Sequence, residues 1–113
     1  MAEYQGHIVI TKYLKQHFLS IEVILDKESI TDKDSFIRLR YNFSKIVRKI
    51  LDDHLYREEP KYNKFIVEFY TFQAEMSTWY IQHSLNKIGE ALECANIDIN
   101  PDVLLYETNA STH

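Results

Sequence analysis

The sequence predicts an all-α protein: an antiparallel bundle of three long helices followed by a short C-terminal helix. Two observations favour this class. Apolar residues recur at three- and four-residue steps along most of the chain, which is the spacing of an amphipathic helix. The 113 residues include only two Gly and two Pro, whereas a sheet protein needs frequent turns. We expect a single helical domain over residues 1–113, with a disordered tail over 108–113.

The first helix is predicted from about Gly6 to Asp26, and the polar stretch 27–33 ends it. Large apolar and aromatic residues follow the helical spacing through this segment. The predicted stripe consists of Ile10, Tyr13, Leu14, His17, Phe18, Ile21, Ile24 and Leu25.

The second helix is predicted to begin near Ser29 or Thr31, each of which an acid follows three residues later, as in an N-cap with an acidic first turn. It should end before Pro60, because the residue that precedes a proline avoids helical geometry. Its predicted stripe consists of Phe36, Leu39, Phe43, Ile46, Val47, Ile50 and His54.

The third helix is predicted within 61–96, a segment without Pro in which Gly89 is the single glycine. Its apolar stripe shifts by about 140° around the axis after His83, which predicts a kink or break near 81–85. Asn100 and Pro101 then resemble the N-cap and first residue of a short helix that reaches position 106.

An α+β fold with a small sheet is the alternative. Segments 7–11 and 65–72 are rich in aromatic and β-branched residues, as strands are. We favour helices because a strand over 65–72 would need apolar cover on both faces, and the chain offers few other candidate strands.

No catalytic residue, cofactor site or metal site is predicted. His17, His54 and His83 lie in the predicted stripes, but they fall in different layers of an antiparallel bundle and cannot share a metal ion. No Glu or Asp has a His three positions later, no Ser is flanked by glycines, and Cys94 has no nearby His. We expect Cys94 to be a small packing residue, and we expect the protein not to be an enzyme.

The expected location is the cytoplasm. The chain has a single cysteine, opens without a charged and then apolar leader, and has no apolar run near the roughly 20 residues of a membrane span. The formal net charge of −4 argues against nucleic acid as a partner.

The charge is unevenly distributed, and this predicts a docking surface. Segment 36–49 carries five basic residues and no acidic one, so the rest of the chain carries −9. On the second helix we expect a basic face opposite the apolar stripe, which would choose an acidic protein partner. The expected function is therefore an adaptor or inhibitor that binds other proteins. The basic partner-binding residues are Arg38, Lys45, Arg48 and Lys49.

Aromatic residues predict self-association. Of the 113 residues, 15 are Phe, Tyr or Trp, and seven of them fall within 62–80. A helix that is apolar all round needs cover on all sides, and Tyr and Trp are favoured at interfaces. We expect a homodimer, with Tyr70, Trp79 and Tyr80 as the interface residues.

Two other functions stay open. Arg48 and His54 are separated by five residues, and this spacing resembles the catalytic motif of the HEPN ribonucleases, which are small all-helical proteins. The match lacks the polar residue that this motif usually has directly after the arginine, since Lys49 stands there. The third possibility is a sensor of an apolar small molecule, held in an aromatic-lined cavity near His83.

Overall fold

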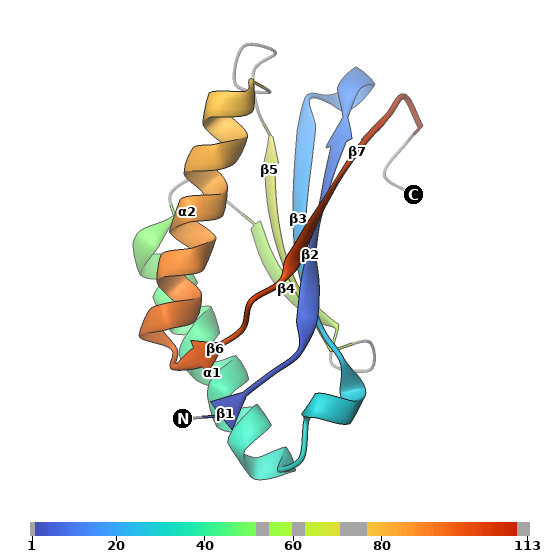
Figure 1. The fold of residues 1–113 in the computed structure, drawn as a ribbon. Helices are drawn as coiled ribbons and strands as arrows, with labels where there is room; N and C mark the ends of the chain where they lie inside the picture. The colour runs from blue at the N-terminus through green and yellow to red at the C-terminus, as the bar shows by residue number, and fades with distance from the viewer. Residues whose placement is uncertain (1, 52–54, 60–62, 71–76, 111–113) are drawn as a thin grey trace.

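The computed structural model describes residues 2–51, 55–59, 63–70 and 77–110, and it shows an α+β fold (Figure 1). The predicted all-α bundle is therefore wrong, and the α+β alternative is confirmed. The described helices are α1 (Lys33–Ile50) and α2 (Thr78–Cys94), with short 3-10 turns at Leu14–Gln16 and Lys27–Ser29. The described strands are β1 (Ala2–Glu3), β2 (Gly6–Tyr13), β3 (Phe18–Leu25), β4 (Leu55–Glu59), β5 (Lys64–Tyr70), β6 (Ile97–Asp98) and β7 (Asp102–Thr108).

The main sheet has the strand order β4-β5-β3-β2-β7. Its body is the four long strands β5-β3-β2-β7, and β4 adds five residues at one edge. All neighbours are antiparallel except β2 and β7, which are parallel. Ile10 lies opposite Ile21 on β3 and opposite Leu105 on β7, so the C-terminal strand completes the sheet beside the N-terminal hairpin.

A hairpin of β2 and β3 replaces the helix expected over 6–26. Alternate residues of these strands are buried, for example Ile8 and Ile10 on β2. Every second residue of a strand also recurs at four-residue steps, so Ile21 and Leu25 fit both periods. The β-branched residues of the segment favour a strand over a helix, because their side chains pack well on a pleated surface.

In the described part of the chain, three non-glycine residues adopt the left-handed geometry that turns often require of glycine. His17, Asn63 and Asn96 have φ values of 51°, 55° and 59°, in the left-handed region. His and Asn are enriched there among non-glycine residues. The low glycine count was therefore not an argument against a sheet.

The predicted long third helix is wrong in its first half, where the chain forms β5. Phe65, Val67 and Phe69 are buried toward the helices, and Ile66 is buried on the other face. The argument that a strand here would need apolar cover on both faces was wrong, because on the face away from the helices Ile66 is buried but Tyr70 is 73 % exposed. α2 then runs without a break from Thr78, so the kink expected near 81–85 is also wrong.

α1 confirms most of the predicted second helix. Phe36, Leu39, Phe43 and Val47 are buried, as the helical stripe predicted. Helix α1 ends at Ile50, well before Pro60, and His54 lies outside the described residues.

The short C-terminal helix is also wrong, because residues 102–108 form β7. The Asn100-Pro101 pair precedes a strand here, and Pro101 stays outside the ladder. Pairing with β2 over seven residues, from His7 with Asp102 to Tyr13 with Thr108, outweighs the local helical signal.

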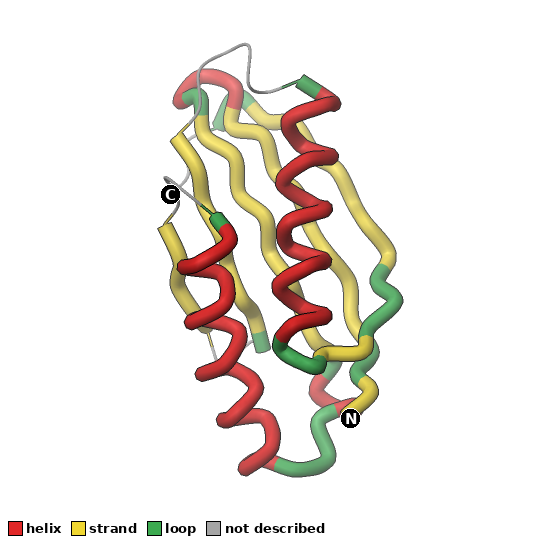
Figure 2. The backbone as a smooth tube through the Cα atoms, turned by 90° about the vertical axis from the view of Figure 1, so that its left-hand side faces the viewer, coloured by secondary structure: helices red, strands yellow, loops and turns green. Residues whose placement is uncertain are grey.

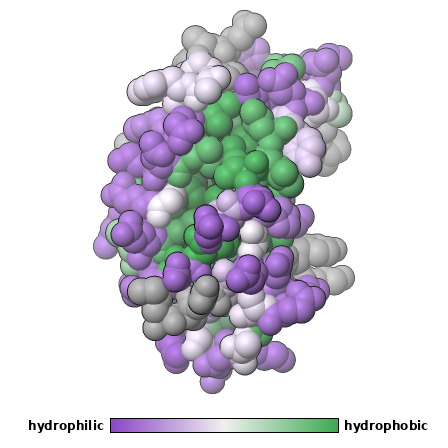
Figure 3. All heavy atoms as spheres, viewed as in Figure 1, coloured by the Kyte–Doolittle hydropathy of each residue, from purple (hydrophilic) through white to green (hydrophobic). Residues whose placement is uncertain are grey.

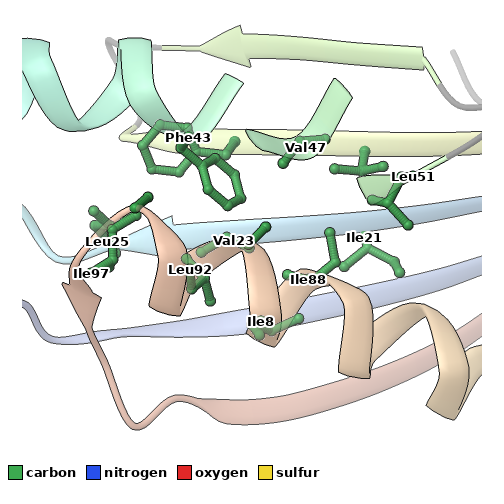
Figure 4. Close-up of a cluster of buried hydrophobic side chains, with 14 of the residues drawn as sticks. Ile8, Ile21, Val23, Leu25, Phe43, Val47, Leu51, Ile88, Leu92 and Ile97 are labelled. Carbon is green, nitrogen blue, oxygen red and sulfur yellow. The ribbon is translucent and has the colours of Figure 1, made fainter. Parts of the chain in front are cut away.

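Both helices lie on one face of the sheet (Figure 2). Phe43 and Val47 of α1 and Ile88 and Leu92 of α2 point toward the strands, where they meet residues such as Ile21 (Figure 4). Within the described residues, no helix is long and apolar enough to cross a membrane.

Asp32 caps α1, and this predicts a pH dependence of stability. The Ser35 hydroxyl donates to its Oδ2 at 2.6 Å and the Asp34 N–H to its Oδ1 at 3.0 Å. These bonds favour the ionised form and hold the pKa of Asp32 below its usual 3.8, with a smaller contribution from Arg38. The stabilisation is complete above the unfolded-state pKa and is lost as the pH falls through the lower folded-state value.

We expect Asp32→Asn, which keeps an oxygen acceptor, to remove this part of the acid dependence. Urea unfolding of both proteins from pH 6 to pH 2 checks it. The stability difference between wild type and variant should shrink below about pH 4. A difference that is independent of pH would show that the charge of Asp32 does not act on the helix.

Candidate protein-interaction surface

The outer edge of the sheet at β7 is the most unusual surface of the molecule. β7 pairs with β2 on one side, and no strand among the described residues pairs with its other side. Four consecutive large apolar residues of this strand are exposed: Val103 (49 %), Leu104 (41 %), Leu105 (54 %) and Tyr106 (53 %). We call these four residues and the free backbone edge beside them the β7 edge.

The β7 edge is open because two helices are too narrow for five strands. A helix is about 10 Å wide and strands lie about 4.8 Å apart, so two helices cover about four strands. On the helix side, Val103 and Leu105 lie beside Ile8 and Ile10, which are buried. Figure 3 shows the resulting hydrophobic area between α2 and β7.

A groove of about 530 Å³ continues this area at the start of β7. α2 and the connection from α2 to β7 form its walls, and Ile8, the register partner of Val103, lies in its lining. The described lining includes the carboxylates of Glu93 and Asp98 and no basic side chain. Any segment that extends from the β7 edge into this groove therefore meets apolar and acidic surroundings.

The sheet face without helices is also apolar near β7. The register places Leu104 beside Val9 and Tyr106 beside Thr11 on this face. Further along the same face, Phe18 contacts Tyr13 and Tyr70, with ring centroids 5.7 Å and 5.0 Å apart. β7 thus exposes apolar side chains on both faces as well as its backbone edge.

One ion pair lies at the end of β7. Lys12 Nζ lies 3.3 Å from Glu107 Oε1, and the Lys12 side chain is only 12 % exposed. The pair joins β2 to β7 and partly neutralises Glu107, the acid that directly follows the apolar run. The surface beside Tyr106 therefore carries little net charge.

The predicted basic residues form a second, separate surface on α1. Arg38, Lys45, Arg48 and Lys49 are all exposed, as expected for the face opposite the apolar stripe. Lys45 Nζ lies 4.8 Å from the centre of the Tyr41 ring. Within the described chain, Lys45, Arg48 and Lys49 have no carboxylate partner. α1 lies toward the β4 side of the sheet, away from β7 (Figure 2).

The structure does not bring the three predicted aromatic residues together. Trp79 and Tyr70 are each 73 % exposed, but Trp79 lies on α2 and stacks on His83 at 5.4 Å, whereas Tyr70 lies on the opposite face of the sheet. Tyr80 is half-buried, with its ring 6.3 Å from that of Phe69. These three residues therefore form no single surface.

The exposure of Trp79 predicts that it contributes little to stability. We expect Trp79→Ala to change the free energy of unfolding by less than about 0.5–1 kcal/mol, because it removes one exposed stacking contact and leaves no cavity. Thermal unfolding checks this. A loss of several kcal/mol would mean that Trp79 is a core residue.

The remaining candidate residues do not assemble a chemical site in the described part of the chain. His17 and His83 are exposed, and no group of three potential metal ligands occurs there. Cys94 is exposed, so its predicted packing role is wrong. Arg48 is exposed on α1, while His54 lies outside the described residues; the all-helical fold that the HEPN resemblance implies is not found.

The cavity expected near His83 corresponds to an open recess of about 380 Å³ between the end of α1 and α2. Its described lining mixes aromatic, apolar and polar side chains, and it holds no enclosed apolar chamber. The lining consists of Ile50, Leu51, Phe69, Tyr80, His83, Ser84 and Lys87.

The β7 edge is not among the predicted sites, although the sequence carries a signal for it. The run from Val103 to Tyr106 is four large apolar residues without a polar position, which fits neither a solvent-facing helix nor an alternating surface strand. No protein-family model, no curated protein and no solved structure matches this chain, so its function has to be inferred from these surfaces.

Proposed function

We propose that this chain is a non-enzymatic interaction protein that accepts a strand from another polypeptide at the β7 edge. The observation that carries the proposal is a seven-residue edge strand with four exposed apolar residues in its centre. Unpaired N–H and C=O groups on such an edge are a template for another strand. The strand contains no Lys, Arg or Pro, and its two charged residues, Asp102 and Glu107, lie outside the apolar run at its centre, so that run has no protective charge within it.

In strand addition, affinity and specificity come from different parts of β7. Backbone hydrogen bonds along β7 supply affinity, and the alternating rows on its two faces select the side chains of the partner. Leu104 and Tyr106 would contact side chains on one face of the incoming strand, and Val103 and Leu105 would contact those on the other face.

The basic face of α1 supports a second binding function. Its exposed cations favour an acidic protein, and complementary charge of this kind mainly sets specificity and association rate. Because α1 and β7 lie on different sides of the molecule, one chain could hold two partners, as an adaptor does. The free, exposed thiol of Cys94 supports a location inside the cell, where thiols stay reduced.

Photo-crosslinking tests the β7 edge. A photoreactive residue replaces Leu104 on β7 or, as the matched control, Leu14 in the turn between β2 and β3; the two leucines are 41 % and 40 % exposed. Irradiation in the native host should give a discrete protein adduct from position 104 and none from position 14. No adduct from 104, or equal adducts from both, would contradict strand addition.

Charge reversal tests the α1 face. We expect the triple variant Arg38→Glu, Lys45→Glu and Lys49→Glu to lose an acidic partner that co-purifies with the wild type, while the adduct from position 104 persists. Retention of that partner by the triple variant would exclude the basic face as its binding site.

A further inference from the structure

We infer that the strand accepted at the β7 edge is β7 of a second copy of this chain, paired antiparallel about a two-fold axis at Leu105. This inference rests on the proposed function and names the partner. In a two-fold pairing the same strand contributes from both sides, so one residue lies opposite itself and its neighbours pair symmetrically. Residues of β7 that lie equally far before and after the axis residue must therefore be compatible as cross-strand neighbours.

Centring on Leu105 pairs all seven residues of β7 and no residue outside it. Asp102 then faces the partner's Thr108, Val103 faces the partner's Glu107, and Leu104 faces the partner's Tyr106. Because residues of equal parity meet, Asp102 and Glu107 never lie opposite each other. No pair of like charges opposes the dimer.

An axis at Leu104 or at Tyr106 fits β7 less well, because each would pair residues that lie outside the strand. Centring on Leu104 would place Pro101 opposite the partner's Glu107, and Pro cannot donate to a ladder. Centring on Tyr106 would pair Asp102 with the partner's Ala110, which lies beyond the end of β7 at Thr108. The apolar run and the ends of the strand therefore select a single register.

This register covers the exposed side chains with one another. On the open face, Leu104 meets the partner's Tyr106, and the two-fold axis repeats this aromatic–aliphatic pair. On the helix side, Leu105 meets the partner's Leu105, and each is 54 % exposed in the single chain. Glu107, opposite the partner's Val103, keeps its own ion pair with Lys12 at 3.3 Å.

Analytical ultracentrifugation of the whole chain over a wide concentration range tests the inference. We expect a reversible dimer for the wild type. Leu105→Lys puts two ammonium groups opposite each other at the axis and should raise the dimer Kd at least about 100-fold. The matched control is Ile37→Lys on α1, where the wild-type side chain is 56 % exposed; it should leave Kd within about twofold.

Circular dichroism of Leu105→Lys should match that of the wild type, because position 105 is exposed. A second measurement locates the axis: in a Cys94→Ser background, Leu105→Cys should form a direct intermolecular disulfide on mild oxidation, since the two thiols face each other. Leu104→Cys should form it far less readily, because it faces the partner's Tyr106 and lies diagonally, about 7–8 Å, from the partner's position 104.

A wild type that stays monomeric at every concentration would overturn the inference, as would a dimer that Leu105→Lys does not weaken. If the monomeric wild type still gave an adduct with a different protein from position 104, the second copy would be excluded and strand addition would stand. If position 104 gave no adduct with any protein, both proposals would fail.

Discussion

Phe43→Ala is expected to lower the free energy of unfolding by about 3–5 kcal/mol. Phe43 is fully buried and points from α1 toward the sheet (Figure 4). Its ring meets that of Phe65 edge-on at a centroid distance of 5.1 Å. Truncation removes this contact and leaves a cavity between two layers that cannot easily collapse. Domains of this size are stable by only about 5–15 kcal/mol, so the variant should be close to unfolding at physiological temperature.

Urea denaturation of wild type and variant measures this loss. Ile37→Ala is the control on the same helix, since Ile37 is 56 % exposed and its truncation should cost less than about 0.5–1 kcal/mol. Similar small effects at both positions would contradict the packing of α1 on β5.

Gly6→Ala is expected to destabilise the protein by about 1–3 kcal/mol or more. Gly6 opens β2 opposite Leu25, and a Cβ there would collide with the carbonyl oxygen of Ile24 on β3. The obstacle is backbone, so the hairpin itself would have to shift. The φ angle of Gly6 is not positive, which leaves the close approach of β3 as the reason for glycine.

Gly89→Ala should have the opposite sign. Gly89 lies in the interior of α2, and a Cβ there would meet no atom within 4 Å. Alanine is the better helix former, so we expect a gain of about 0.5–1 kcal/mol. Thermal unfolding of both variants checks the pair. Equal effects would mean that β2 and β3 do not approach as closely as described.

α1 could be predicted from the sequence because its signals are local and agree. The N-terminal cap, the buried stripe that includes Phe36 and Val47, and the exposed basic face all lie within one segment. The cap is Asp32 rather than the neighbouring residues expected. The spacing of apolar and polar residues within one segment is enough to predict an amphipathic helix. The same spacing correctly predicted that Arg38 and Lys49 are exposed.

The sheet could not be predicted in the same way because each of its four long strands has at least one partner that is distant in sequence. β2 pairs with β7, where His7 meets Asp102, and β3 pairs with β5. β-propensity depends on cross-strand packing and burial rather than on the segment alone. The apolar residues of these segments also fit a helical spacing. The sequence of one segment does not identify the distant strand with which it pairs.

The β7 edge was the least predictable feature. A run of apolar residues normally indicates burial, and residues 103–106 are exposed because the strand order places β7 last, beyond the reach of both helices. An edge is a property of the whole sheet. The sequence could show that Val103 to Tyr106 need cover, but not that the single chain leaves them without it.

Hydrogen exchange at the backbone amides of β7 tests the central claim most directly. Alternate amides of this strand point toward β2 and should be protected at every concentration, which provides an internal control. The amides between them point outward. We predict that they are protected at high protein concentration and exchange rapidly on dilution or in Leu105→Lys. Outward amides that exchange equally fast under all these conditions would contradict strand pairing between two copies at the β7 edge.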